Sequence, residues 1–168
     1  KISRLPAPVI SLGNITAGGT GKTPAAVWLV QELEKNFRQK PILLSRGYGK
    51  DETKLLEQLL PQTPHLVHPQ RVVAGEKAVA KYGNYVIFVL DDGFQHRQLY
   101  RDIDIVLLDA TCPFGYGYLL PRGFLRESLT NIRRADAIII THSDMVAPEI
   151  LAALHQKLVK LFGNLVIA

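Results

Sequence analysis

The sequence has a single cysteine, Cys112, among its 168 residues. No internal disulfide can form, so the chain is not a disulfide-stapled secreted domain and does not need an oxidising compartment. It also lacks any run of 18 apolar residues, and its longest apolar runs, such as residues 85–90, suit buried strands rather than a membrane-spanning helix. The first residues contain no hydrophobic segment of the kind that a signal peptide needs.

Dense clusters of lysine and arginine are absent too, which argues against a nucleic-acid partner. The chain has 20 Lys and Arg against 15 Asp and Glu, a net charge of +5. This balance suits a phosphate-rich ligand, nucleic acid or an anionic membrane surface, although solubility alone explains it equally well. With 47% hydrophobic and 21% charged residues, the composition is that of a globular protein. Disordered, collagen-like and low-complexity classes are therefore excluded for most of the chain.

Short apolar runs rich in β-branched residues alternate with segments of helical periodicity along the chain. We expect strands at residues 8–12, 42–44, 65–67, 85–90, 103–108, 137–140 and 165–167. We expect helices at residues 23–37, 51–60, 71–82 and 148–162, and a loop at residues 112–131. Nearly continuous apolar strands that alternate with helices predict an α/β fold with a mostly parallel sheet, flanked by helices on both faces.

The strongest motif lies between the first strand and the first helix, where residues 18–23 read Gly-Gly-Thr-Gly-Lys-Thr. Glycines let successive backbone N–H groups converge on a phosphate, and the following helix adds its positive N-terminus. Lys22 is expected to reach the β- and γ-phosphates, and the Thr23 hydroxyl to bind Mg²⁺. A glycine-rich turn with a chance lysine is the alternative. The predicted nucleotide-binding residues are Thr16, Ala17, Gly18, Gly19, Thr20, Gly21, Lys22 and Thr23.

Two aspartates, Asp91 and Asp92, follow the apolar strand of residues 85–90. They lie at the carboxyl edge of the predicted sheet, where ligands of α/β proteins bind. Beside a P-loop, an aspartate in this position holds Mg²⁺ directly or through water. Adjacent residues point to different sides, so both need not be ligands, and a solvated strand end is the alternative.

Four further polar residues are weaker candidates. Arg46 follows the second strand at the same edge and is either a phosphate ligand or part of a surface turn. A carboxylate of Asp51 or Glu52 could accept a proton from an acceptor hydroxyl, although acids at a helix start commonly serve as caps. His96 is either a contact to phosphate or metal-bound water, or an ordinary surface histidine. Residues 141–144 match a guanine-reading Asn-Lys-x-Asp motif at one position only, which assigns no base preference.

Taken in order, the motifs resemble one family. They occupy residues 13–24, 45–49, 51–52, 90–96, 101–110, 114–115, 119–121, 125–127 and 134–137. Over nearly its whole length the chain is similar to the tetraacyldisaccharide 4'-kinases, the lipid A 4'-kinases of Gram-negative bacteria. The P-loop alone would indicate only an NTPase. The run Asp-Asp-Gly-Phe-Gln-His at residues 91–96 and the Leu-Arg-Glu at residues 125–127 make the resemblance specific.

This resemblance implies ATP- and Mg²⁺-dependent phosphorylation of the 4'-hydroxyl of a tetraacylated disaccharide 1-phosphate, a lipid A precursor. It also implies peripheral association with the cytoplasmic face of the bacterial inner membrane. Asp51 aligns with the family's Asp-Glu-Pro motif and becomes the candidate general base. The implied catalytic residues are Asp51, Lys22, Arg126, Glu127 and His96. The implied substrate-binding residues are Arg46, Tyr48 and Asn14, and the implied metal-binding residues are Thr23, Asp91, Asp92 and Glu52.

The resemblance also has departures. Family members are about twice as long, so we expect residues 1–168 to form one P-loop NTPase-like domain that lacks the family's N-terminal membrane segment and C-terminal half. Between Gly49 and Asp51 the chain is shorter than the family, and Thr53 replaces a proline. Two other interpretations stay open. One is a different P-loop enzyme, such as a metallochaperone-type GTPase or an ATP-dependent ligase, and the other is a nucleotide-binding half that does not catalyse alone.

Overall fold

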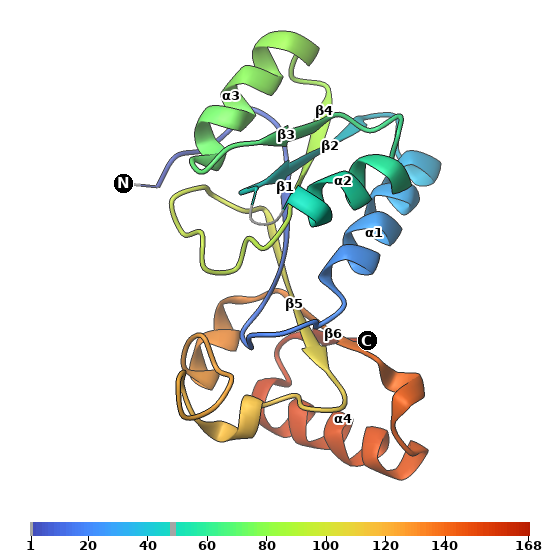
Figure 1. Ribbon diagram of the computed structural model, residues 1–168, viewed down its shortest axis with the longest axis vertical. Coiled ribbons are helices and arrows are strands. Elements are labelled where there is room, and N and C mark those ends of the chain that lie inside the picture. The colour runs from blue at the N-terminus through green and yellow to red at the C-terminus, as the bar shows by residue number, and fades with distance from the viewer. Residues whose placement is uncertain (1, 48–49) are drawn as a thin grey trace. The chain divides into compact units, whose positions relative to one another are not determined.

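The computed structural model describes residues 2–47 and 50–168, in which strands alternate with helices (Figure 1). The strands are β1 (Val9–Asn14), β2 (Lys40–Ser45), β3 (His65–Val67), β4 (Val86–Leu90), β5 (Ile103–Asp109), β6 (Ala137–Thr141) and β7 (Val166–Ile167). The α-helices are α1 (Lys22–Asn36), α2 (Lys50–Leu59), α3 (Arg71–Tyr82) and α4 (Pro148–Phe162). Short 3₁₀ helices are η1 (Gly115–Gly117), η2 (Leu129–Arg134) and η3 (Ser143–Met145). Every strand and α-helix expected from the sequence is present.

The strands form a parallel sheet in the order β3-β2-β4-β1-β5-β6-β7. Parallel register is found between β2 and β3, β2 and β4, β1 and β4, β5 and β6, and β6 and β7. Parallel neighbours need crossover connections, which the intervening helices provide. The prediction of an α/β fold with a parallel sheet is confirmed.

The chain divides into two compact units. The first unit contains the described residues up to Leu12 and from Thr23 to Asp102, and the second contains Gly13–Lys22 and Ile103–Ala168. Strand β1 therefore begins in the first unit and ends in the second. The expectation of a single domain over residues 1–168 stays a prediction.

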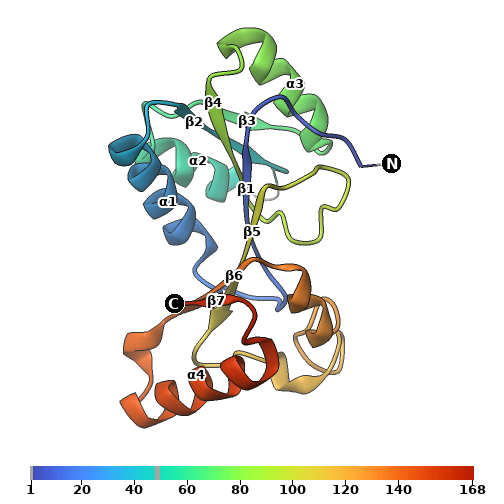
Figure 2. The same cartoon turned by 180° about the vertical axis from the view of Figure 1, so that it is seen from behind.

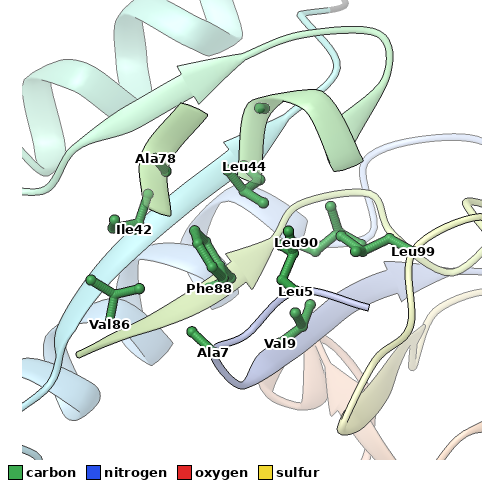
Figure 3. Close-up of a cluster of buried hydrophobic side chains, with 11 residues drawn as sticks. Leu5, Ala7, Val9, Ile42, Leu44, Ala78, Val86, Phe88, Leu90 and Leu99 are labelled. Atoms are coloured by element: carbon green, nitrogen blue, oxygen red, sulfur yellow. The ribbon is translucent and has the colours of Figure 1, made fainter. Parts of the chain in front are cut away.

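A buried apolar cluster holds the first unit together (Figure 3). Alternate residues of a strand point to the same face of a sheet. In β2 these are Ile42 and Leu44, and in β4 they are Val86, Phe88 and Leu90. Helix α3 covers this face with Ala74 and Ala78, while α1 and α2 lie on the opposite side of these strands (Figure 2). The members of the cluster are Leu5, Ala7, Val9, Ile42, Leu44, Ala74, Ala78, Val86, Phe88, Leu90 and Leu99.

In the second unit, β5 and β6 are largely apolar and α4 buries one stripe. The buried residues of α4 are Leu154, Leu158 and Phe162, spaced by four residues so that they share one face. The segment that the sequence predicted as a loop, residues 112–131, contains η1 and the start of η2. Within the described residues, no helix combines the length and the apolar character that crossing a bilayer requires.

Candidate functional site

Residues 16–22 of the P-loop belong to the second unit and follow β1 closely. Gly18 and Gly21 have φ angles of 114° and 77°, in the left-handed region that favours glycine. At Gly21, an added Cβ would also lie 3.3 Å from Cγ2 of Thr141. The loop therefore needs glycine at these two positions, as a phosphate-binding turn requires. Lys22 is the first residue of α1, where the helix N-terminus adds positive partial charge.

Thr20 is held in this loop by two side chains from strand ends. Nδ2 of Asn14 donates to Oγ1 of Thr20 at 2.5 Å and to the Thr16 carbonyl at 2.8 Å. Oγ1 of Thr141, the last residue of β6, donates to the Thr20 carbonyl at 3.0 Å. Asn14 and Thr20 are 0% and 3% exposed, so water does not compete for these bonds. The side-chain amide of Asn14 thus hydrogen-bonds to the P-loop itself. This favours a role in shaping the loop over direct contact with substrate.

Thr141 was not proposed as a site residue from the sequence, because residues 141–144 match a guanine-reading motif only at Asp144 and nothing pointed to the Thr141 hydroxyl. We expect Thr141→Val to weaken ATP binding about tenfold, since the Thr20 carbonyl loses its donor while the side-chain shape is kept. Thr141→Ser retains the hydroxyl and is expected to bind ATP with nearly wild-type affinity. Isothermal titration of the three proteins checks this, and equal affinity of the valine variant and the wild type would contradict it.

Residues 124–126 run beside the first half of the P-loop. The backbone N–H of Ala17 donates to the Phe124 carbonyl at 2.7 Å, and that of Arg126 donates to the Ile15 carbonyl at 2.7 Å. These bonds place the backbone of Arg126 next to the loop, and its catalytic role stays a prediction. Oε2 of Glu127 accepts from Arg134 at 2.9 Å and from Asn131 at 2.8 Å. Glu127 is therefore held by η2, which suits a positioning group more than a proton acceptor.

The first unit brings Thr23 and Glu52 together. Oγ1 of Thr23 donates to Oε1 of Glu52 at 3.1 Å, which joins the starts of α1 and α2. Asp51 precedes Glu52 in the first turn of α2 and is exposed. Both acids also favour helix formation there, because negative charge stabilises a helix N-terminus. Tyr48, predicted to bind substrate, lies outside the described residues.

The aspartate pair lies at the carboxyl end of β4. The register pairs Leu90 with Ser11 of β1, so the pair follows the strand next to the one that leads into the P-loop. Asp91 is 7% exposed, and its backbone N–H donates to the Leu44 carbonyl at 2.9 Å. Asp92 has a φ of 48°, a left-handed conformation that aspartate tolerates.

The predicted metal ligands are the carboxylates of Glu52, Asp91 and Asp92 and the hydroxyl of Thr23. All are oxygen ligands, which Mg²⁺ prefers. Over residues 2–47 and 50–168, no group of three or more His, Cys, Asp or Glu side chains is arranged to hold a metal ion. A site for Mg²⁺ does not need such a group, because this ion is commonly bound by one or two carboxylates together with substrate phosphates and water. The residues present in the first unit therefore fit Mg²⁺.

Arg46 and His96 line one cavity of about 430 Å³ in the first unit. Arg71 and Arg97 line it too, and neither was singled out from the sequence. Burial lowers the pKa of His96 to about 4, and the positive charges of Arg71, Arg101 and Arg46 act in the same direction. His96 is therefore neutral at pH 7. A sequence signal for Arg71 does exist, because a cation at the first residue of a helix opposes the helix dipole.

Comparison with known proteins places these features in a family. The sequence profile of the Tetraacyldisaccharide-1-P 4'-kinase family matches residues 1–166. The tetraacyldisaccharide 4'-kinase of Syntrophus aciditrophicus is 45% identical over 162 aligned positions, which cover 82% of this chain and 43% of that protein. The chain thus spans less than half the length of that relative. The aligned positions exceed the residues that this chain contributes, so the relative has residues that the chain lacks within the matched region.

Solved structures agree with this result. The crystal structure of LpxK from Aquifex aeolicus in complex with ATP has a TM-score of 0.79 and 30% identity, covering 100% of this chain and 72% of that one. The signal recognition particle 54 kDa protein of Aeropyrum pernix in complex with GDP has a TM-score of 0.64 at 16% identity, covering 96% of this chain and 41% of that one. The second likeness shows the fold alone, and the P-loop NTPase-like fold is confirmed. The chain belongs to the tetraacyldisaccharide-1-P 4'-kinase family.

Proposed function

We propose that this chain forms the nucleotide-binding part of a kinase. The kinase would transfer the γ-phosphoryl group of ATP to the 4'-hydroxyl of tetraacyldisaccharide 1-phosphate, a step of lipid A biosynthesis. The observation that carries this proposal is the P-loop, held at Thr20 from two strand ends, in a chain of this family. Because the chain spans 43% of one such kinase, we further propose that a C-terminal half completes the active site.

In this proposal, the P-loop N–H groups and Lys22 bind the β- and γ-phosphates of ATP. Arg126, which the Ile15 carbonyl holds beside the loop, stabilises the charge on the transferred group. Asn14 acts on the nucleotide indirectly, through Thr20 and the Thr16 carbonyl. Such transfer depends mostly on positioning and charge, so a loop fixed before ATP binds lowers the reorganisation required.

The metal ligands in this proposal are Thr23, Glu52 and the pair Asp91 and Asp92. The 3.1 Å bond between Thr23 and Glu52 supports it, since two oxygen donors from different helices already meet there. When bound, Mg²⁺ would neutralise charge on the β- and γ-phosphates. Asp51, beside Glu52 in the first turn of α2, would accept the proton of the 4'-hydroxyl. Arg46, Tyr48 and His96 would contact the acceptor, and Glu127 would position its neighbours.

The proposed location is the cytoplasmic face of the bacterial inner membrane. Residues 116–124 of the second unit support membrane contact, because five large apolar side chains there are exposed by 47 to 70%. They are Tyr116, Tyr118, Leu119, Leu120 and Phe124. The guanidinium of Arg122 lies 3.7 Å from the Tyr118 ring centroid, and the segment has no acidic residue. Tyrosine and arginine beside exposed leucines are typical of a surface that meets an anionic lipid interface.

We expect the double variant Leu119→Asp, Leu120→Asp to bind vesicles of phosphatidylglycerol and phosphatidylcholine about tenfold less well than the wild type. The change removes two exposed apolar side chains and adds charge of the sign that anionic lipid repels. Sedimentation with vesicles measures the bound fraction. Ile150→Asp, at an exposed apolar position of α4, is the matched control and should bind as the wild type does. Equal binding of the double variant would contradict membrane contact by this segment.

Transfer of labelled γ-phosphate from ATP to tetraacyldisaccharide 1-phosphate in detergent micelles tests the proposed function. The assay uses the chain alone and the chain joined to the C-terminal half of the Syntrophus relative. Label in the lipid in either form supports the proposal. No label in both forms would contradict it. Competition between ATP and GTP separates a GTPase, because a kinase of this family is expected to select ATP.

A further inference from the structure

We infer that Asp109 and His142 form a positioning pair that sets the geometry of the P-loop. The pair acts through Thr141, whose hydroxyl donates to the Thr20 carbonyl at 3.0 Å. All four residues belong to the second unit. The expected effect of the pair on ATP affinity rests on the proposed function, whereas its effect on the geometry of the loop rests on these contacts alone.

The pair lies where the pairing of β5 with β6 ends. Asp109 and Thr141 are the last residues of these strands and stand opposite each other. The backbone N–H of Ala110 donates to the Thr141 carbonyl at 2.9 Å, and His142 follows at once. The ends of strands are where a sheet opens most readily. A side-chain contact just beyond the last paired residues therefore helps to hold Thr141 in place.

Asp109 is a fixed acceptor for this contact. Its Oδ2 lies 3.0 Å from Nδ1 of His142, and its Oδ1 accepts from the backbone N–H of Thr111 at 2.9 Å and from the Thr111 hydroxyl at 2.6 Å. Burial raises the pKa of Asp109, but the hydrogen bonds from Thr111 and the contact with His142 outweigh burial and hold this pKa below its ordinary value. The carboxylate is therefore ionised at pH 7. An imidazole can donate to it from Nδ1 whether the ring is neutral or charged.

His142 has an uncommon backbone conformation. Its φ and ψ angles are 53° and 32°, in the left-handed region that residues other than glycine seldom adopt, although histidine is among those that tolerate it. Its carbonyl accepts from the backbone N–H of Met145 at 3.0 Å, across η3. The side chain of Asp109 is 17% exposed, so water competes only partly for the contact. The bond to Asp109 therefore offsets the strain of the turn by which the chain leaves β6.

Thr141 connects this turn to the P-loop. Its Oγ1 lies within hydrogen-bond distance of two carbonyl oxygens, at 3.0 Å from that of Thr20 and 3.3 Å from that of Leu108. A threonine hydroxyl has one proton to donate, so a small displacement of Thr141 can exchange one acceptor for the other. Its Cγ2 would also lie 3.3 Å from a Cβ added at Gly21, so the side chain stands close to that residue too. A displacement of Thr141 would therefore alter the two residues that precede Lys22.

Three substitutions of His142 separate the contact from the strain. His142→Ala loses the donor and fits the left-handed turn poorly, and we expect it to weaken ATP binding about fivefold. His142→Gly fits the turn but also lacks the donor, so it should bind ATP more weakly than the wild type. His142→Asn should bind ATP with nearly wild-type affinity, because asparagine tolerates the turn and its Nδ2 is attached to Cγ as Nδ1 of histidine is.

Isothermal titration with ATP and Mg²⁺ measures these affinities, and thermal unfolding checks that each variant folds. His155→Ala, at an exposed position of α4, is the matched control for the loss of a histidine and should bind as the wild type does. Wild-type affinity of His142→Gly would show that only the strain matters and would overturn the inference. An asparagine variant that binds no better than His142→Ala would overturn it as well.

A double variant tests whether the pair acts through Thr141. Thr141→Val already removes the hydroxyl, so adding His142→Ala should weaken ATP binding by less than about twofold more. Independent effects would instead multiply, to a total loss of about fiftyfold. A loss of that size would show that His142 acts by another route and would overturn the inference.

NMR of the nucleotide-free chain gives a readout that does not depend on ATP. The amide signals of Thr20 and Gly21 should shift in His142→Ala, return close to their wild-type positions in His142→Asn and stay unchanged in His155→Ala. Unchanged signals in His142→Ala would overturn the inference. If these signals shift as expected but the wild-type chain binds no ATP, the proposed function fails while the positioning pair stands.

Discussion

Lys22→Ala is expected to weaken ATP binding about 100-fold while leaving the fold unchanged. Lys22 starts α1, and its ammonium is the mobile positive charge of a loop whose other phosphate donors are backbone N–H groups. No backbone group can replace this charge on the β- and γ-phosphates. Phosphoryl transfer should fall further than binding, because the negative charge that Lys22 stabilises is redistributed in the transition state.

Isothermal titration of the chain with ATP and Mg²⁺ measures this effect. Lys35→Ala removes a lysine from the last turn of the same helix and is the matched control, since the Lys35 ammonium is exposed and pairs with Glu32 at 2.8 Å. Thermal unfolding of both variants checks that the fold survives. Wild-type ATP affinity in Lys22→Ala would remove the assignment of residues 16–23 as the nucleotide site.

Asp51→Asn is expected to reduce phosphoryl transfer by about 10²- to 10⁴-fold and to leave ATP affinity unchanged. The amide keeps the size of the side chain but cannot accept the proton of the acceptor hydroxyl. Because the effect falls on the chemical step, kcat should drop while the KM for ATP stays near its wild-type value.

This measurement needs the form of the protein that transfers phosphate, either the chain alone or the chain joined to a C-terminal half. Glu57→Gln, at an exposed position later in α2, is the control for a lost carboxylate on the same helix. If transfer by Asp51→Asn equals that of the wild type, another group is the base. The shortening between Gly49 and Asp51 makes this a sharp test of whether Asp51 keeps its place.

The fold could be predicted from the sequence because its pattern is consistent at every level. Apolar runs of β-branched residues become buried strands, and Pro24 and Pro148 stand in the first turns of α1 and α4. Strand β1 extends to Asn14, two residues beyond its apolar run. This extension is a tertiary effect, because Asn14 is stabilised by hydrogen bonds to the P-loop that no local pattern reveals.

The site could be predicted only in part. The P-loop and the aspartate pair could be proposed from the sequence because each is a short run of residues at a strand end. Thr141 and Arg71 were not identified from the sequence, because their surroundings form only when the chain folds. Thr141, for example, contacts Thr20, which is 121 residues away in the sequence. A single threonine carries no signal of such a contact, and the unusual position of Arg71 at the start of a helix does not show which groups it faces. The roles of the acidic residues at α2 and β4 stay predictions that the variants above test.

We propose that this chain supplies the nucleotide site of a kinase that phosphorylates the 4'-hydroxyl of its acceptor. The position of the new phosphate tests this proposal. Lipid product formed from tetraacyldisaccharide 1-phosphate, ATP and Mg²⁺ is isolated and examined by phosphorus NMR, with Lys22→Ala in parallel. We expect a second phosphate monoester at the 4'-position, formed by the wild type and absent with Lys22→Ala. A phosphate at the 4'-position that forms equally well with Lys22→Ala, or a new phosphate at any other position, would contradict it.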